Sequence, residues 1–147
     1  MRRRLFLHRA ITALAVVLLP RIALPAWPKA AFEAKTLKAV MHDLFADATP
    51  IESAAVQLKM QPIAQSGAVV PVTVSSTLEN VSAISIIVEK NPAPLTARFT
   101  MPPGTEPFIA TRIKMGETSR VIALVQSGDK LYSASMEVKV TIGGCGG

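Results

Sequence analysis

Apolar residues in the early part of this chain recur at intervals typical of an α-helix. Between residues 28 and 46 they are separated by three to five positions with charged residues between them, at Phe32, Leu37, Val40, Met41, Leu44 and Phe45. This spacing predicts an amphipathic helix. Pro28 suits the first turn of a helix, and Pro50 is typical of the region just after a helix end. We therefore expect one N-terminal helix, followed by a short linker.

After Pro50 the spacing of apolar residues changes to every second position, which is typical of β-strands. The pattern predicts seven strands, over residues 54–60, 69–75, 84–89, 95–101, 108–115, 120–126 and 130–142. Gly, Pro, Asn, Asp and Ser gather between them, as expected of turns. Seven short strands without helical patterns between them predict an all-β fold, an antiparallel β-sandwich of immunoglobulin-like architecture. The Cys–Trp–Cys signature of true immunoglobulin domains is absent, so the architecture alone is predicted.

One of the predicted strands, residues 69–75, contains a proline. Pro71 has no N–H to donate to a neighbouring strand, so we expect this strand to be an edge strand or to carry a bulge. An edge strand could receive a strand from a partner, or could be a protected edge with no partner.

The first 26 residues have the pattern of an export signal. A basic start is followed by a short apolar run at residues 11–19, which is too short to cross a membrane. The pair Arg3-Arg4 followed by Phe6 and Leu7 is similar to a twin-arginine signal, and general secretion is the other route. We expect cleavage near residue 26 and a periplasmic location in a bacterium.

Length and charge exclude several classes of protein. The 147 residues allow one domain, with the helix and linker at 27–50, the sandwich at 51–142 and a tail at 143–147. The net charge of +6 comes from 16 basic and 10 acidic residues, but five arginines lie in the expected signal and leave 11 basic residues against 10 acidic. The mature chain therefore gives no electrostatic reason to expect nucleic acid or an anionic membrane as a partner.

The body of the chain has no pattern typical of a catalytic or metal site. The single cysteine excludes an internal disulfide and a cysteine-based zinc site, and the two histidines leave little room for a histidine-ligated metal. His42, beside Asp43 on the predicted helix, is interpreted as a surface residue. We expect neither a metal nor a cofactor, and no enzymatic activity of the chain itself.

The candidate chemistry lies in the last five residues, Gly143, Gly144, Cys145, Gly146 and Gly147. Glycine has no side chain to pack, and five residues extend over at most about 17 Å, so we expect a flexible arm that presents an exposed thiol. No basic residue accompanies Cys145 to lower the pKa of its thiol, and the terminal carboxylate lies two residues away. A carrier that partner enzymes load and unload is therefore favoured over an enzyme.

The chain resembles the SoxY family, the sulfur carriers of the bacterial thiosulfate-oxidising Sox system. The C-terminal sequence VKVTIGGCGG carries the resemblance most specifically, and the body agrees over residues 66–74, 86–95, 103–119 and 130–147. The resemblance implies an immunoglobulin-like sandwich in the periplasm. It also implies that Cys145 is the covalent attachment site for thiosulfate-derived sulfur.

The same resemblance implies a set of partners. SoxZ, another β-sandwich protein, would form a heterodimer with this chain. The haem c complex SoxAX would couple thiosulfate to the thiol, the manganese-dependent hydrolase SoxB would release sulfate, and a sulfur dehydrogenase, where present, would oxidise the remaining sulfur. The exposed thiol itself predicts a homodimer linked through Cys145 under oxidising conditions.

Two other functions remain open from the sequence. A ubiquitin-like sulfur carrier would use Gly146-Gly147 as a terminal thiocarboxylate, although such proteins are cytosolic and mix helices with strands. An exported β-sandwich that only binds other proteins would not need residues 143–147 at all.

Overall fold

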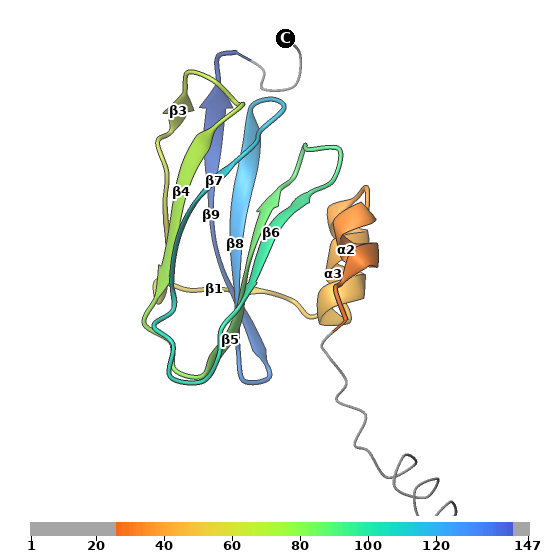
Figure 1. Cartoon of the computed structure of the whole chain (residues 1–147), viewed down its shortest axis with the longest axis vertical. Coiled ribbons are helices and arrows are strands. Elements are labelled where there is room, and N and C mark those ends of the chain that lie inside the picture. Colours follow the sequence, from red (N-terminus) through yellow and green to blue (C-terminus); the bar gives the residue numbers. More distant parts are fainter. Residues whose placement is uncertain (1–25, 143–147) are drawn as a thin grey trace, which may run out of the picture.

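The computed structural model describes residues 26–142 (Figure 1). The expected export-signal residues Arg3, Arg4, Phe6 and Leu7 lie outside this range. Two helices, α2 (Lys29–Glu33) and α3 (Leu37–Phe45), precede nine strands. The strands are β1 (Ile51–Glu52), β2 (Val56–Lys59), β3 (Ile63–Ala64), β4 (Val70–Ser76), β5 (Val81–Val88), β6 (Leu95–Thr100), β7 (Phe108–Ile113), β8 (Ser119–Ser127) and β9 (Lys130–Val140).

The strands form two sheets. The larger sheet has the order β1-β9-β8-β5-β6, with β3 also paired to β9, and the smaller has the order β2-β4-β7. The long ladders are antiparallel, whereas β1 and β3 run parallel to β9 over two residues each. The predicted all-β, sandwich-like fold is confirmed, and each of the seven predicted strands corresponds to one of the strands found. The two-residue strands β1 and β3 were not predicted.

The principal core lies between the two sheets. Alternation along β4 directs Val70, Val72 and Val74 inward, where all three are buried. Ile84 and Ile86 of β5 face them from the larger sheet. The residues of this core lie in the longest segments in which apolar residues occur at every second position, as expected when one face of each strand is buried.

The helices cover the outer face of the larger sheet on the side of β5 and β6 (Figure 1). Ala31 and Val40 pack there against Ile87, Ile122 and other buried residues of a second apolar cluster. Ile87 of β5 and Ile122 and Leu124 of β8 are therefore buried on the outer face, and the central parts of both strands are buried on both faces. The molecule has three layers: the smaller sheet, the larger sheet and the helices.

The single predicted helix is two helices in the structure, so that prediction is wrong in this detail. Ala34 has an extended backbone with ψ 138°, and Thr36 begins α3 as its N-cap. The Thr36 Oγ1 accepts a hydrogen bond from the Ala39 N–H at 3.2 Å. Capping by a threonine side chain competes with helix continuation and explains the break.

The prediction of an edge strand at Pro71 is correct only locally. β4 lies between β2 and β7, and its register with β7 has no bulge. However, β2 ends opposite Thr73, so Pro71 has a strand neighbour on one side only, at Arg112 of β7. The missing N–H of proline therefore leaves no ladder position unfilled.

One charged side chain is half-buried beneath the helices. The Arg98 guanidinium donates hydrogen bonds to Ser85 Oγ at 2.9 Å and to Gln126 Oε1 at 3.3 Å. It lies 5.5 Å from the centre of the Phe45 ring, within the range of a cation–π contact. Burial lowers the pKa of Arg98 from its usual value, but the guanidinium stays charged.

Candidate functional site

The residues predicted to carry the chemistry follow directly after the described part of the chain. Cys145 and the four glycines Gly143, Gly144, Gly146 and Gly147 lie outside it, so the prediction of a flexible arm stays a prediction. Ile142 is the last described residue. The candidate site is therefore the surface from which residues 143–147 continue, at the end of β9.

The end of β9 is held by hydrogen bonds to the segment around β3. The Thr141 N–H donates to the Ala64 carbonyl at 3.1 Å, and the Thr141 hydroxyl donates to the Gln65 carbonyl at 2.9 Å. The Gly67 N–H then donates to the Ile142 carbonyl at 2.9 Å. These bonds continue the pairing of β9 with β3 beyond the last strand residue. The chain is thus fixed in position up to the residue before Gly143.

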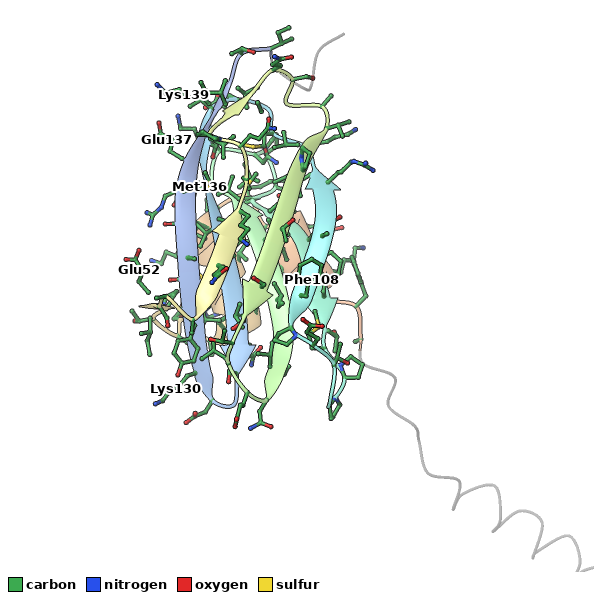
Figure 2. The ribbon with its side chains drawn as sticks, turned by 90° about the vertical axis from the view of Figure 1, so that its left-hand side faces the viewer. Glu52, Phe108, Lys130, Met136, Glu137 and Lys139 are labelled. Atoms are coloured by element: carbon green, nitrogen blue, oxygen red, sulfur yellow. The ribbon has the colours of Figure 1, made fainter. Side chains whose placement is uncertain are left out.

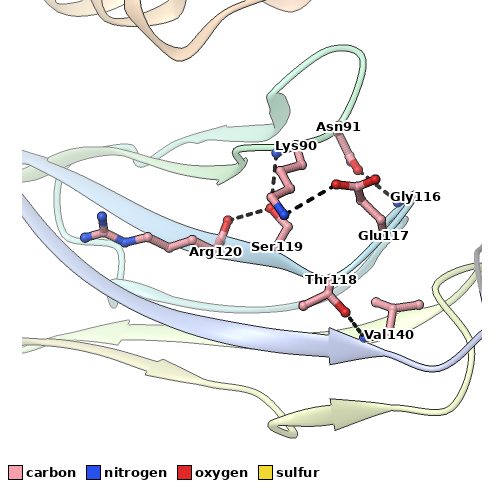
Figure 3. A network of polar contacts seen from close by, with 8 residues as sticks. All are labelled: Lys90, Asn91, Gly116, Glu117, Thr118, Ser119, Arg120 and Val140. Atoms are coloured by element: carbon pink, nitrogen blue, oxygen red, sulfur yellow. Dashed lines mark hydrogen bonds and ion pairs between the residues drawn. The ribbon is translucent and has the colours of Figure 1, made fainter.

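A second set of contacts holds the same strand end from the side of β8 (Figure 3). The Thr118 hydroxyl oxygen accepts a hydrogen bond from the Val140 N–H at 2.9 Å. Thr118 lies one residue before β8, where the main-chain ladder between β8 and β9 has ended. A side chain therefore takes the place of a main-chain partner at this position.

The loop that carries Thr118 is itself held by polar contacts (Figure 3). The Asn91 side-chain amide donates to the Lys114 carbonyl at 2.8 Å and its oxygen accepts from the Gly116 N–H at 3.0 Å. The Lys90 ammonium lies 3.5 Å from Glu117, although both side chains are exposed and the pair contributes little to stability. The two hydrogen bonds of the Asn91 side chain to main-chain groups therefore hold the loop more strongly than the Lys90–Glu117 ion pair does.

Three large apolar side chains are exposed near this end of β9. Ile63 of β3 is 55% exposed, Val69 before β4 is 58% exposed, and Ile142 is 67% exposed. Pairing of β3 with β9 and the Gly67–Ile142 hydrogen bond bring the three segments to the same end of the sandwich. The surface beside the attachment point is therefore more apolar than a solvent-facing strand end requires.

Among residues 26–142, no group of three or more His, Cys, Asp or Glu side chains could hold a metal ion. His42 lies on α3, where its Nδ1 is 2.9 Å from the Asp47 carboxylate. That hydrogen bond, with the charge of Asp47, raises the pKa of His42 above 6.5. Both side chains are exposed, in agreement with the interpretation of His42 as a surface residue. Within the described part of the chain, no helix is long and apolar enough to span a membrane.

Sequence reasoning placed the chemistry at Cys145 but did not find the residues that hold the strand end. Thr118, Thr141 and Asn91 act through side-chain hydrogen bonds to main-chain groups distant in sequence. Threonine at the end of a strand and asparagine in a turn are common, so no local pattern distinguishes these residues. Their partners become known only when the fold brings the segments together.

Comparisons with known proteins point to one family. The family model of the sulfur oxidation protein SoxY matches residues 41–145. The solved structure of the sulfur carrier protein SoxY from Chlorobium limicola f thiosulfatophilum is similar, with a TM-score of 0.66 and 37% sequence identity. The match covers 78% of this chain and 100% of that chain.

A chain from a solved structure of T cell activation by the bacterial superantigen toxic shock syndrome toxin-1 is more distant. It has a TM-score of 0.44 and 11% identity, and the match covers 60% of this chain and 99% of that one. No curated protein matches. The family model spans most of the chain and ends at Cys145, and the similar solved structure is covered over its whole length. The chain belongs to the SoxY family.

Proposed function

We propose that this protein is a sulfur carrier of the Sox system and that Cys145 is the residue that bears the sulfur. The observation that carries the proposal is the extent of the family match, which runs from α3 through the sandwich to Cys145. The similar solved structure is described as a sulfur carrier protein. Cys145 is also the one thiol in the chain, so no other residue can form a disulfide-type conjugate.

The proposed loading step is an oxidation. The Cys145 thiol and thiosulfate form a new S–S bond, giving the protein–S–S–SO3⁻ conjugate, one proton and two electrons, which the haem c complex SoxAX accepts. Hydrolysis by SoxB then breaks the bond between the outer sulfur and the sulfonate group. It consumes one water and gives sulfate, two protons and a protein-bound persulfide. The carrier supplies the sulfur atom that is modified, and the partner enzymes supply the catalytic groups.

The division of labour fits the groups that surround the attachment point. The thiolate is the reactive form of cysteine, and its formation is favoured by a nearby cation, a metal or a helix N-terminus. The residues beside Cys145 are glycines, so the sequence next to the thiol supplies no cation. We infer that a partner's active site lowers the pKa of the thiol when the C-terminal segment enters it.

The proposal includes a location and a constant partner. An N-terminal export signal would bring the protein to the periplasm, where the Sox enzymes act on it. A SoxZ-like β-sandwich protein would form a heterodimer with this chain, and SoxAX, SoxB and a sulfur dehydrogenase would bind only transiently.

Intact-mass measurement tests the proposal directly. The purified chain, its SoxZ-like partner and SoxAX are incubated with thiosulfate and an electron acceptor, and the mass of the chain is recorded. We expect the mass of one thiosulfate conjugate, removed again by dithiothreitol. Absence of the adduct, or thiosulfate oxidation that persists with Cys145→Ser, would contradict the proposal.

A matched control moves the single thiol to another exposed position. The double variant Cys145→Ser/Thr105→Cys has one thiol in the exposed loop before β7. We expect it to react with a general thiol reagent but not to be loaded by SoxAX. Equal loading of both thiols would show that position does not matter.

Two further changes distinguish the other functions. One residue appended after Gly147 abolishes a thiocarboxylate carrier but leaves the thiol of Cys145 in place. Deletion of residues 143–147 leaves a simple binding module active but abolishes a thiol carrier. We expect loading to survive the first change and to be lost with the second.

A further inference from the structure

The edge of β9 that faces away from β8 is covered only at its two ends. β1 pairs with β9 at Tyr132 and Ser133, and β3 pairs with it at Lys139 and Val140. Between β1 and β3 the chain leaves the larger sheet and forms β2, which pairs with β4 in the other sheet. Residues 134–138 of β9 therefore have no strand neighbour on this side.

The free edge carries main-chain groups that point away from β8. Near its two ends, Ser133 C=O accepts from Ser53 N–H and Lys139 N–H donates to Pro62 C=O, so the odd-numbered residues face this edge. By the alternation of a strand, the N–H and C=O of Ser135 and Glu137 face it as well. No main-chain partner is found for them among residues 26–142. This is an open template for one more strand.

The inner face of the sandwich is also incompletely closed beside this edge. Ala134 and Met136 face the core but are only half-buried, whereas the next inward residue, Val138, is buried. Across from them Leu58 and Met60, in and after β2, are likewise half-buried. Figure 2 shows Met136 on the side where β9 lies beside β2. A strand added to β9 would bury apolar side chains against these residues.

The length of the free edge restricts what can occupy it. Five residues of strand extend over about 17 Å. The β9 of a second copy has eleven residues and is flanked by its own β1 and β3, so it does not fit between them. The segment 143–147 of this family member has four glycines and no apolar side chain larger than that of cysteine, so it would leave the space beside Met136 empty. A short segment of a different chain fits both requirements.

Charge on the outer face indicates the side chains of that segment. Glu52 of β1 and Glu137 of β9 are both exposed and form no ion pair with another residue in the range 26–142. The Arg120 guanidinium donates to Ser135 and lies 3.9 Å from Glu89. A basic side chain of the added strand, opposite Ser135, would lie between the carboxylates of Glu52 and Glu137. At the other end of the added strand, the positive charge of Lys139 favours a polar, uncharged neighbour.

We propose that the free edge of β9 over residues 134–138 binds a short extended segment of a partner protein as an additional β-strand. The segment has apolar side chains at alternate positions, directed toward Met136 and Leu58, and a basic side chain on its outer face. The proposal rests on the edge itself and not on the sulfur chemistry, so either can fail without the other.

Amide hydrogen exchange measured by NMR on the full chain tests the free edge. In the protein alone, the N–H groups of Ser135 and Glu137 exchange rapidly, whereas those of Met136 and Val138, which face β8, exchange slowly. The probe is an acetylated and amidated pentapeptide, Thr-Val-Lys-Val-Thr. We expect it to slow exchange at Ser135 and Glu137. Slow exchange without the peptide, or no slowing at its solubility limit, would overturn the proposal.

Two N-methylated forms of the same peptide test main-chain pairing. One is methylated at both valines, and the other at lysine and both threonines, so each has one blocked edge. A peptide paired with β9 along one edge donates only the N–H groups of alternate residues, and each methylated form blocks one of the two alternate sets. We therefore expect one form to bind as the parent peptide does and the other to lose at least about tenfold in affinity. Equal binding of both forms would exclude pairing.

Matched variants of the protein separate the main chain from the side chain. Glu137→Pro removes the free N–H but none of the bonds to β8, and we expect at least about a tenfold loss of peptide affinity. Glu137→Gln keeps the N–H and is expected to lose no more than about threefold. Slow exchange of the β8 amides reports that each variant is folded. A larger loss with Gln than with Pro would overturn the proposal.

Discussion

The two faces of β5, in the larger sheet, are equally buried at Ile86 and Ile87 but are covered by different kinds of structure. Ile86 and Ile87 are consecutive residues of β5, and both are fully buried. Ile86 faces the second sheet, whose strands are joined by ladders of distant residues, whereas Ile87 faces two helices of five and nine residues. Helices of this length are not stable alone in water, so the outer layer depends on the sheet for its structure. Equal burial of the two side chains therefore does not mean that the structures covering them unfold together with the sheet.

Replacement of Ile86 by alanine is expected to have the largest effect. The cavity lies between two sheets that cannot move together without breaking their ladders, so the free energy of unfolding falls by about 2–5 kcal/mol. Urea denaturation followed by circular dichroism measures the loss. A fall of less than about 1 kcal/mol would show that the core between the sheets can collapse around the cavity.

Replacement of Ile87 by alanine sharpens the comparison because Ile87 has the same side chain as Ile86 and is buried to the same extent. The short helices can shift toward the sheet or detach from it, so the global loss is expected near the lower end of the range, about 2 kcal/mol. Hydrogen exchange of the α3 amides is expected to accelerate more than that of β8. If the two alanine variants lose equal stability and α3 exchanges only by global unfolding, the two faces form one cooperative unit.

Thr36→Ala tests the helical layer without touching the sheet. It removes the side-chain cap of the Ala39 N–H at the start of α3, which is expected to cost about 1 kcal/mol. The effect should appear as faster exchange in α3, with a smaller change in global unfolding. Thr36→Ser serves as the control because serine also caps and should keep the exchange rates close to those of the original protein.

Asp47→Asn is expected to have the smallest effect. The hydrogen bond to Asp47 raises the pKa of His42, and this variant lowers that pKa toward 6.5. The pair stabilises the folded state fully only below the unfolded-state pKa of about 6.5, and its contribution is lost as pH rises through the higher folded-state pKa. NMR titration of the His42 ring measures the shift. An unchanged pKa would show that Asp47 is not the cause.

The sequence predicted the long strands well because each buries one face over six residues or more. The inward residues Val70, Val72 and Val74 alternate in the sequence as they do in the fold. β1 and β3 could not be predicted in this way, because two residues have no period and both strands exist only through pairing with β9. The break between α2 and α3 depends on one side chain, Thr36, within a continuous apolar pattern.

The chemistry at Cys145 stays a prediction, and the contacts that hold the strand end before it were not predicted. A single cysteine among glycines at a chain end is a local feature, and the notion of a carrier followed from it and from the family resemblance. The contacts of Thr118 with Val140 and of Gly67 with Ile142 join segments far apart in sequence. Contacts of this kind depend on sheet register, which the pattern of apolar residues determines only within each strand.

The hydrogen bonds around Thr141 and Ile142 set a geometric limit on any enzyme that would act on Cys145 in the proposed way. Cys145 lies three positions after Ile142, which confines the cysteine Cα to a sphere of about 10 Å radius around that fixed point. A catalytic centre at the bottom of a tunnel deeper than this radius plus one side chain is out of reach. The length of the tether therefore selects shallow active sites, and each inserted glycine would extend the accessible depth by about 3.4 Å.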